Sequence, residues 1–242
     1  MSEVATHHTG HNSGIHCGTC YEPGSLKARL CTEGARAMYE YWDVHDIPGA
    51  RSGKLLVALD VSEVPGPDVL EHRGRANKGP GPRGSHTLAQ IRGMEPHAAG
   101  VAALHSPNTG VVNFAEVNWA IGRELEGLGA RVMRGAGVNS IRSGLSTATV
   151  AVERICRQAR LLCTGLWARS HRTPGRRPCR SARSVPFRGA YLHLRPEARA
   201  RVRSMTYPVP DPRLPFLGVH LARRHIDDSV SVGPTAMRGA LS

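Results

Sequence analysis

The chain has 242 residues, of which 40% are hydrophobic, and it carries a formal net charge of +13. This length is ample for a hydrophobic core in one large domain or two small ones, and no apolar run approaches the roughly 18 residues that cross a bilayer. Six cysteines without a signal peptide indicate a reduced, cytoplasmic setting, with peripheral contact at the inner membrane left open.

Two regular elements are predicted in the first quarter of the chain. Ser25 is a good N-cap for a helix that runs to about His45, and Pro48 and Gly49 then end it. The apolar residues of this helix recur at helical spacing, which indicates one buried side. Residues 54–59 (KLLVAL) are a short apolar strand.

Proline and glycine dominate the next stretch. Residues 62–77 favour a helix capped by Ser62, but the Pro-Gly-Pro of residues 65–67 interrupts its first turns, so a start after Pro67 is the alternative.

A glycine pattern follows at residues 79–84 (GPGPRG), which match the dinucleotide-binding string G-x-G-x-x-G. We reject the match because no strand precedes it and no amphipathic helix follows directly. Pro80 and Pro82 also lack the N–H groups that a pyrophosphate needs. We expect a loop here.

The clearest helix spans residues 113–128. Asn113 is its N-cap, and Glu116 stands three residues on, as a capping box requires. Residues 131–133 and 138–141 then resemble short strands. With the segment before Asn113 they predict a β-α-β unit.

Residues 151–184 fit no period and hold nine arginines against one acidic residue, so most of the net charge comes from them. Such a basic segment raises nucleic-acid binding as an alternative. It lacks interleaved aromatic residues beyond Trp167 and any helical or zinc module. A disordered or misdirected segment explains it better, and we expect no nucleic-acid partner.

Order returns at residue 185. Residues 185–194 and 217–223 are predicted strands on either side of a proline-rich loop at 207–216. Asp227 and Asp228 then turn the chain into a last apolar segment.

The polar loop ahead of the first helix carries the most chemistry. Its candidate ligands are His7, His8, His11, His16, Cys17 and Cys20. A glycine-punctuated loop that leads into a helix N-terminus suits an anion or a cofactor edge. Structural zinc is an alternative, although one C-x-x-C without a second ligand pair is a moderate signal. A redox dithiol and a Ser or Cys triad lack their strand–turn–helix context. A solvated loop with incidental histidines is the plainest alternative.

Residues 9–48, TGHNSGIHCGTCYEPGSLKARLCTEGARAMYEYWDVHDIP, resemble the L-2-hydroxyglutarate oxidase/dehydrogenase family of FAD-dependent oxidoreductases. Further similar stretches follow in the same order, and together they cover over half of the chain. They are residues 52–60, 95–117, 185–198 and 207–236.

This resemblance implies an α/β (α+β) fold. A partial FAD-binding, Rossmann-like domain lacking its first βαβ unit would join a substrate domain built on an antiparallel sheet. Residues 1–50 would be a partial FAD-binding region and 51–110 part of the substrate domain. Residues 111–170 would return to the FAD-binding domain, with a degraded segment at 151–184. Residues 185–242 would supply further substrate-domain strands, truncated at the C-terminus.

The implied reaction is oxidation of L-2-hydroxyglutarate to 2-oxoglutarate by hydride transfer to FAD, with oxygen or a membrane quinone as the electron acceptor. The flavin carries the redox chemistry, while the protein supplies positioning and a base. Alternatives are a related FAD-dependent 2-hydroxy-acid or amino-acid oxidoreductase, an inactive fragment, and a basic or metal-binding protein.

Individual roles follow from the resemblance. His16 is the implied base or hydroxyl-orienting group, and His220, in FLGVH, is the competing candidate. Lys27, Arg188 and Tyr207 are the implied substrate-binding residues, because a diacid needs cations for its carboxylates. Glycine in a turn permits close approach of a flavin. The implied flavin contacts are Gly10, Asn12, Ser13, Gly14, Thr164, Gly165, Gly233 and Pro234.

Three departures from the family pattern matter. The resemblance begins after the family's glycine-rich turn for the FAD pyrophosphate, one residue is missing between Gly14 and His16, and residues 151–184 keep the pattern only as CTGLW. Paired frameshifts in a GC-rich gene would produce the last departure. Because the glycine-rich turn for the FAD pyrophosphate is missing from the resemblance, we expect this polypeptide to bind FAD weakly or not at all.

Overall fold

A computed structural model describes residues 4–12, 14–15, 20–77, 83–136, 138–142, 147–150, 153–156, 187–211, 213, 218–224 and 227–238. The helices are α1 (Leu26–Val44), α2 (Pro65–Ala76), α3 (Leu88–Met94), α4 (Phe114–Gly127) and α5 (Pro196–Arg199), with a 3-10 turn η1 (Val61–Glu63). None of these described helices is both long and apolar enough to cross a membrane.

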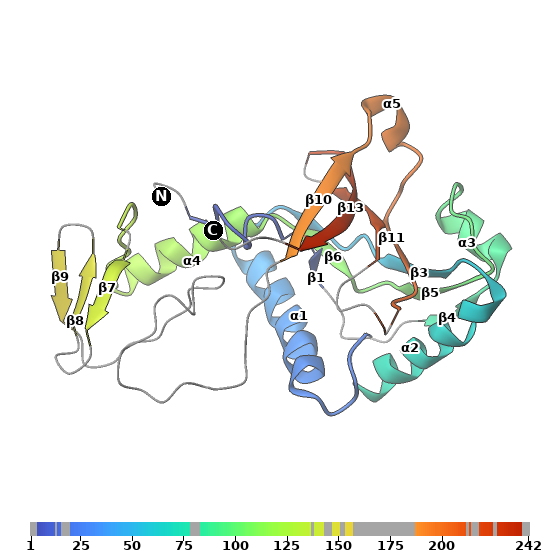
Figure 1. Ribbon diagram of the computed structural model, residues 1–242, viewed down its shortest axis with the longest axis horizontal. Coiled ribbons are helices and arrows are strands. Elements are labelled where there is room, and N and C mark those ends of the chain that lie inside the picture. The colour runs from blue at the N-terminus through green and yellow to red at the C-terminus, as the bar shows by residue number, and fades with distance from the viewer. Residues whose placement is uncertain are drawn as a thin grey trace.

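The strands of the first half are β1 (Gly14–Ile15), β2 (Gly49–Ala50), β3 (Lys54–Ala58), β4 (Arg83–His86), β5 (Ala102–Ser106) and β6 (Gly110–Val112). Those that follow are β7 (Val138–Arg142), β8 (Thr147–Val150), β9 (Glu153–Cys156), β10 (Phe187–His193), β11 (Met205–Pro208), β12 (His220–Arg224) and β13 (Ser229–Arg238). They form a seven-stranded sheet in the order β10-β13-β12-β11-β3-β5-β4 and two three-stranded sheets, β1-β6-β2 and β7-β8-β9 (Figure 1).

The large sheet combines strands from two distant parts of the chain. Strands β3, β4 and β5 come from the first half, and β10 to β13 come from the last quarter. The two sets meet where β3 pairs in parallel with β11, with Lys54 opposite Met205. All other neighbours are antiparallel. The sheet was expected to be antiparallel, and it is mixed. One edge of β3 pairs with β5, and the other edge pairs with β11, which runs parallel to it.

Helices cover both faces of this sheet. Side chains along β3 alternate between two buried faces, so its apolar residues follow one another without polar residues between them. Leu70 of α2 packs on one face, in a core with Leu56, Leu104, Val111, Met205, Tyr207 and Ala222. Ile91 of α3 packs on the other face, in a core with Leu55, Val57 and Ala103. Every side chain of β3 is therefore buried.

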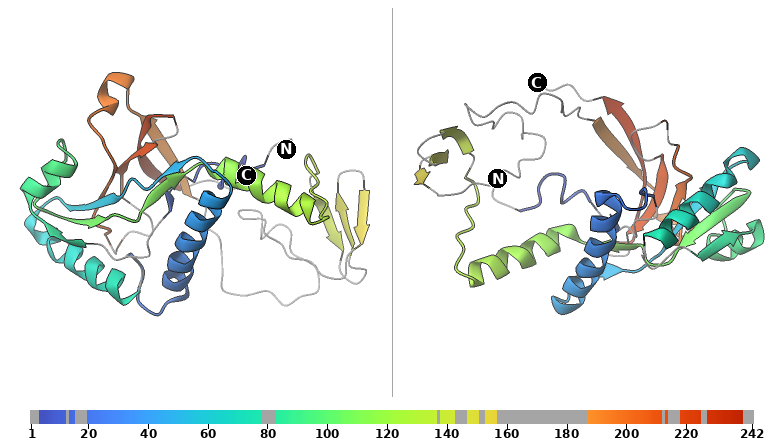
Figure 2. Two further views of the ribbon diagram at one scale, coloured as in Figure 1. Left: turned by 180° about the vertical axis from the view of Figure 1, so that it is seen from behind. Right: turned by 90° about the horizontal axis from the view of Figure 1, so that it is seen from below.

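The predicted long helices α1 and α4 are confirmed. The Ser25 hydroxyl accepts the N–H of Ala28 at 3.2 Å, and the Asn113 side chain accepts the N–H of Ala115 at 3.1 Å. Both helices pack beside the sheet β1-β6-β2, and the views of Figure 2 show them crossing next to it. The buried residues of that core are Ile15, Ile47, Val112, Val117 and Ala120.

The helix expected from Ser62 begins instead at Pro65, and Ser62 lies in η1, which Asp60 caps. Residues 65–67 do not interrupt the helix, because the first turn leaves its N–H groups without intrahelical partners and proline lacks only that group. Within the expected loop at residues 79–84, Arg83 and Gly84 belong to β4, and residues 79–82 lie outside the described part of the chain.

The β-α-β unit predicted around α4 is wrong. Strand β6 precedes α4 and pairs with β1 and β2, whereas β7 follows α4 and pairs with β8, so the flanking strands lie in different sheets. Residues 131–133 do not form a strand. A short apolar run becomes a strand only where a neighbour offers an open edge, which local pattern does not reveal.

The last quarter follows the prediction more closely. Strands β10 and β12 confirm the predicted strands, and Asp227 and Asp228 form a turn. Tyr207 and Pro208, placed in the proline-rich loop, instead end strand β11. Proline is tolerated at a strand end because the ladder there needs no further N–H donor.

Glu95 joins α3 to the segment before β11, and we predict that replacing it destabilises the chain. Its buried carboxylate accepts the N–H of Arg203 at 3.0 Å, the hydroxyl of Ser204 at 2.7 Å and the N–H of Ser204. Glu95→Ala leaves these donors unpaired and should lower the free energy of unfolding, measured by urea denaturation, by about 2 kcal/mol or more. Glu33→Ala, which removes an exposed pair with Arg29, is the matched control and should change it little.

Candidate functional site

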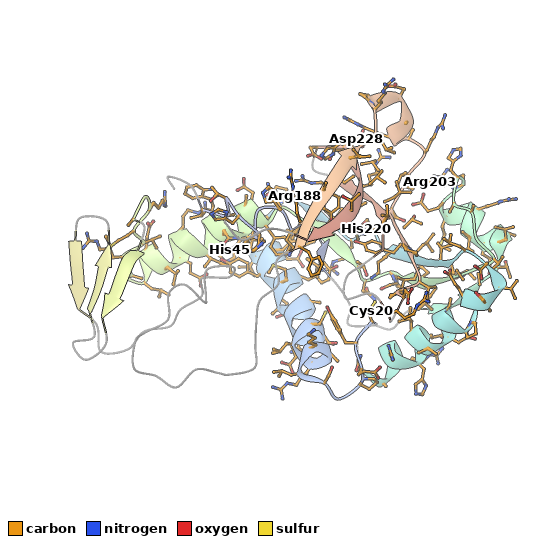
Figure 3. The ribbon with its side chains drawn as sticks, viewed as in Figure 1. Cys20, His45, Arg188, Arg203, His220 and Asp228 are labelled. Atoms are coloured by element: carbon orange, nitrogen blue, oxygen red, sulfur yellow. The ribbon has the colours of Figure 1, made fainter. Side chains whose placement is uncertain are left out.

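Four polar side chains lie across one face of the large sheet. They come from four strands and form what we call the polar row: Tyr191 of β10, His220 of β12, Tyr207 of β11 and Lys54 of β3. Register places them on one face, because Tyr207 stands opposite Leu56, two residues along β3 from Lys54. Figure 3 shows His220 within the sheet, beside β10 and β13.

Ring contacts hold the polar row together. The Tyr207 and His220 rings stack with centroids 3.8 Å apart and planes 10° apart. Lys54 Nζ lies 5.1 Å from the Tyr207 centroid, and Tyr191 meets His220 edge-on at 6.1 Å. Aromatic pairs contribute about 0.5–1.5 kcal/mol each and cation–π contacts a similar amount. The imidazole is therefore held in one orientation.

A backbone carbonyl fixes the tautomer of His220. Nδ1 lies 3.0 Å from the carbonyl oxygen of Gly218, which can only accept a hydrogen bond, so Nδ1 carries the proton. In the neutral ring, Nε2 then keeps its lone pair. His220 is thus built to accept a proton at Nε2.

Burial of the polar row sets which protonation states it favours. Burial lowers the pKa of His220, and the nearby Lys54 charge lowers it further, against the opposing effect of the Gly218 hydrogen bond. Burial raises the pKa of Tyr207 and that of Tyr191. Near neutral pH the site therefore offers a neutral imidazole acceptor and two phenol donors beside a lysine. These groups suit a small ligand with a hydroxyl and a negative charge.

The close contact between β10 and β13 explains why residue 233 is a glycine. It has φ +155°, and a Cβ there would lie 2.8 Å from both the Ala190 carbonyl oxygen and a Tyr191 ring carbon. Pro234 likewise packs against Gly189, where a Cβ would lie 2.8 Å from it. These contacts account for both residues through β10 packing, so the flavin role of Gly233 and Pro234 stays a prediction.

The described residues of the N-terminal loop fit a flavin at one position. Gly10 is explained by a tight turn, since a Cβ there would overlap the Ala5 carbonyl oxygen. Asn12 accepts the N–H of Gly14 at 3.3 Å. Gly14 itself lies on β1, which pairs with β6 and has no described strand on its other edge. Figures 1 and 2 both place β1 beside the β10–β13 end of the large sheet. A planar cofactor could approach the backbone there because glycine has no side chain.

Other predicted site residues lie elsewhere. Lys27 is exposed in the first turn of α1. Arg188 is exposed on β10, and Figure 3 labels it beside that strand, apart from His220. Outside the described residues are Ser13, His16, Thr164 and Gly165. Within the described part of the chain, no three His, Cys, Asp or Glu side chains gather as a metal site would require.

Sequence reasoning missed Lys54. Its side chain is 2% exposed, although lysine is rarely buried. The available signal was a cation at the start of an otherwise apolar strand, KLLVA. Without the β11 pairing, that lysine reads as the solvated end of the strand.

Comparison with known proteins gives one family. The family model described as "FAD dependent oxidoreductase" (DAO) matches residues 1–241. The chain is 42% identical to the mitochondrial L-2-hydroxyglutarate dehydrogenase of Nematostella vectensis, 37% to that of Mus musculus and 36% to L-2-hydroxyglutarate dehydrogenase of Indibacter alkaliphilus. Each alignment covers 97% of this chain but 55%, 53% and 59% of the relative, so the chain spans about half their length.

Solved structures agree at the level of the fold. L-alpha-glycerophosphate oxidase from Mycoplasma pneumoniae matches 99% of this chain and 64% of its own, with TM-score 0.76 and 19% identity. Glycine oxidase from Geobacillus kaustophilus matches 95% and 61%, with TM-score 0.74 and 16% identity. The mixed α/β arrangement is therefore part of a larger known fold.

We predict that His220 titrates below the usual histidine pKa of about 6.5, because burial and Lys54 both disfavour the imidazolium. The unfolded chain then binds the proton more tightly than the folded chain does. The stability that neutral, buried His220 contributes is therefore fully present above about pH 6.5 and is lost as pH falls through the folded pKa. The His220 pKa is measured by following the histidine Cε1–H resonances by NMR against pH. Lys54→Met should move the His220 pKa upward, and an unchanged value would contradict the charge effect.

Proposed function

We propose that this chain, which belongs to the DAO family of FAD-dependent oxidoreductases, takes part in the oxidation of L-2-hydroxyglutarate to 2-oxoglutarate. Support comes from its relatives named L-2-hydroxyglutarate dehydrogenase. FAD, when bound, supplies the two-electron acceptor for this oxidation. The electrons then pass to oxygen or to a membrane quinone. Because the chain spans about half of those relatives, the activity of the whole protein is part of the proposal.

One observation carries the proposal: the fixed tautomer of His220. Oxidising a secondary alcohol removes the hydroxyl proton as well as the hydrogen on carbon. Nε2 of His220 accepts that hydroxyl proton, because Nδ1 already donates to Gly218 and the buried ring is neutral near pH 7. The stacked Tyr207 ring keeps the imidazole from rotating away.

Tyr207 and Tyr191 serve as positioning and donor groups in this proposal. Both phenols are protonated near neutral pH, since burial raises their pKa, and each donates a hydrogen bond to a substrate oxygen. Tyr207 is 8% exposed and Tyr191 is 47% exposed, so the substrate enters past Tyr191. His16 remains the competing base and Lys27 and Arg188 remain proposed carboxylate partners, while Gly10, Asn12 and Gly14 are proposed to lie along the flavin.

The proposal predicts stereospecific flavin reduction. The purified chain is mixed anaerobically with excess FAD, and the 450 nm absorbance is followed after addition of L-2-hydroxyglutarate. Bleaching should occur with the L isomer and be far slower with D-2-hydroxyglutarate or L-glutamate. Equal bleaching by L-glutamate would count against the proposed substrate, and absence of bleaching with FAD in excess would count against activity of this chain.

His220→Asn provides the matched variant. The Asn side-chain N–H reproduces the donor to Gly218 but offers no nitrogen base in place of Nε2. The rate of flavin reduction should fall about 10²–10⁴-fold, as expected when a general base is lost, while thermal stability falls modestly because the ring contacts with Tyr207 and Tyr191 are lost. A variant with the original rate would leave His16 as the base.

A further inference from the structure

Strand β10 is an exposed edge of the large sheet. It stands at one end of the strand order, pairs with β13 through one edge, and has no described strand on its other edge (Figure 1). Six of its seven residues are exposed, and the seventh, Ala190, is of intermediate exposure. Unlike β3, whose two faces are buried, β10 therefore has side chains in contact with solvent on both faces.

The opposite edge of the same sheet has features that usually prevent pairing with another chain. Strand β4 is only four residues long, and its register against β5 shifts between Arg83 and Ser85, so β4 carries one extra residue as a bulge. Strand β10 is seven residues long and contains no proline. Its own register shift, between Ala190 and Leu192, takes up the extra residue on β13. The edge of β10 is therefore regular, and another strand can extend it.

The exposed side chains of β10 suit contact with another protein strand. Leu192 is 72% exposed, Phe187 is 50% exposed and Tyr191 is 47% exposed. Such side chains favour the addition of a strand, because backbone hydrogen bonds form along the edge while apolar surface is removed from water. The formal charge of β10 is carried by Arg188. A partner strand must therefore place no cation opposite that residue.

A second copy of β10 meets this requirement. Two identical edges pair antiparallel about a two-fold axis, and all seven residues pair only when Ala190, the middle residue, lies opposite Ala190 of the second copy. Arg188 then lies opposite Leu192 of the second copy, and Gly189 lies opposite its Tyr191. The two arginines are four residues apart along the ladder, or about 13 Å. Their charges therefore do not face one another.

We propose that this chain forms a symmetric dimer by antiparallel pairing of β10 with β10 of a second copy, with Ala190 at the two-fold axis. The two large sheets then join into one. The pairing lies in the plane of the sheet, so the face that carries the polar row stays open to a ligand. The dimer does not depend on the reaction proposed above, because it uses the edge of β10 and not the chemistry of His220.

Sedimentation equilibrium of the purified chain tests the dimer. One chain has a mass of 26.1 kDa, and the mean mass should rise toward twice that value as the concentration increases. Leu192→Lys places a cation opposite Arg188 of the second copy, twice per dimer, and should raise the dissociation constant at least about tenfold. Arg188→Glu combined with Leu192→Lys restores an opposite-charge pair and should recover most of the affinity. Leu128→Lys, at an exposed position at the end of α4, is the matched control and should leave the dissociation constant unchanged.

Hydrogen exchange supplies a second measurement at the edge itself. The backbone N–H groups of β10 that point away from β13 should exchange more slowly as the chain concentration increases, because the second copy then pairs with them. The proposal is overturned by a mass of 26.1 kDa at every concentration. It is also overturned by a dimer that Leu192→Lys weakens no more than Leu128→Lys does, or by a double variant that binds no more tightly than Leu192→Lys alone. Slow exchange in a monomer overturns it as well, since another segment of the same chain would then cover the edge.

Discussion

The parallel pairing of β3 with β11 is the contact on which the polar row depends. It brings Lys54 beside Met205 and Leu56 beside Tyr207, although these strands lie about 150 residues apart in the chain. Side chains alternate along a strand, so a slip of one residue would turn Lys54 and Leu56 toward α3 and leave Tyr207 without its cation. The apolar neighbours Leu70 and Leu104 disfavour that slip because it would remove Leu56 from the core that they share.

A second constraint comes from the β10–β13 edge. Gly233 stands opposite His220 and lacks a side chain, so the Tyr191 ring reaches across it to the imidazole. Any larger residue at position 233 would meet that ring and the Ala190 carbonyl. The same glycine was expected to serve a flavin. That role stays a prediction, and in the structure the missing side chain lets an aromatic ring from a neighbouring strand close the exposed end of the row.

Local signals predicted the local elements well. Ser25 and Asn113 cap the helices that they were expected to cap, and the KLLVA run forms a strand. Non-local contacts could not be predicted, because the edge on which β11 pairs is invisible in either segment alone. Residues 131–133 have a strand-like pattern but no strand, for the same reason. His220 was proposed from the family resemblance, whereas the position of Lys54 on the same face needed the register of the sheet.

The basicity of His220 depends on where the sheet places its ring. Burial and the nearby Lys54 charge lower the pKa of His220, so the ring is neutral near pH 7 but is also a weak base. The stacked Tyr207 ring holds the imidazole at a fixed place relative to Lys54, because Tyr207 contacts both. The same pairing of β3 with β11 that builds the row therefore also sets how readily its histidine accepts a proton.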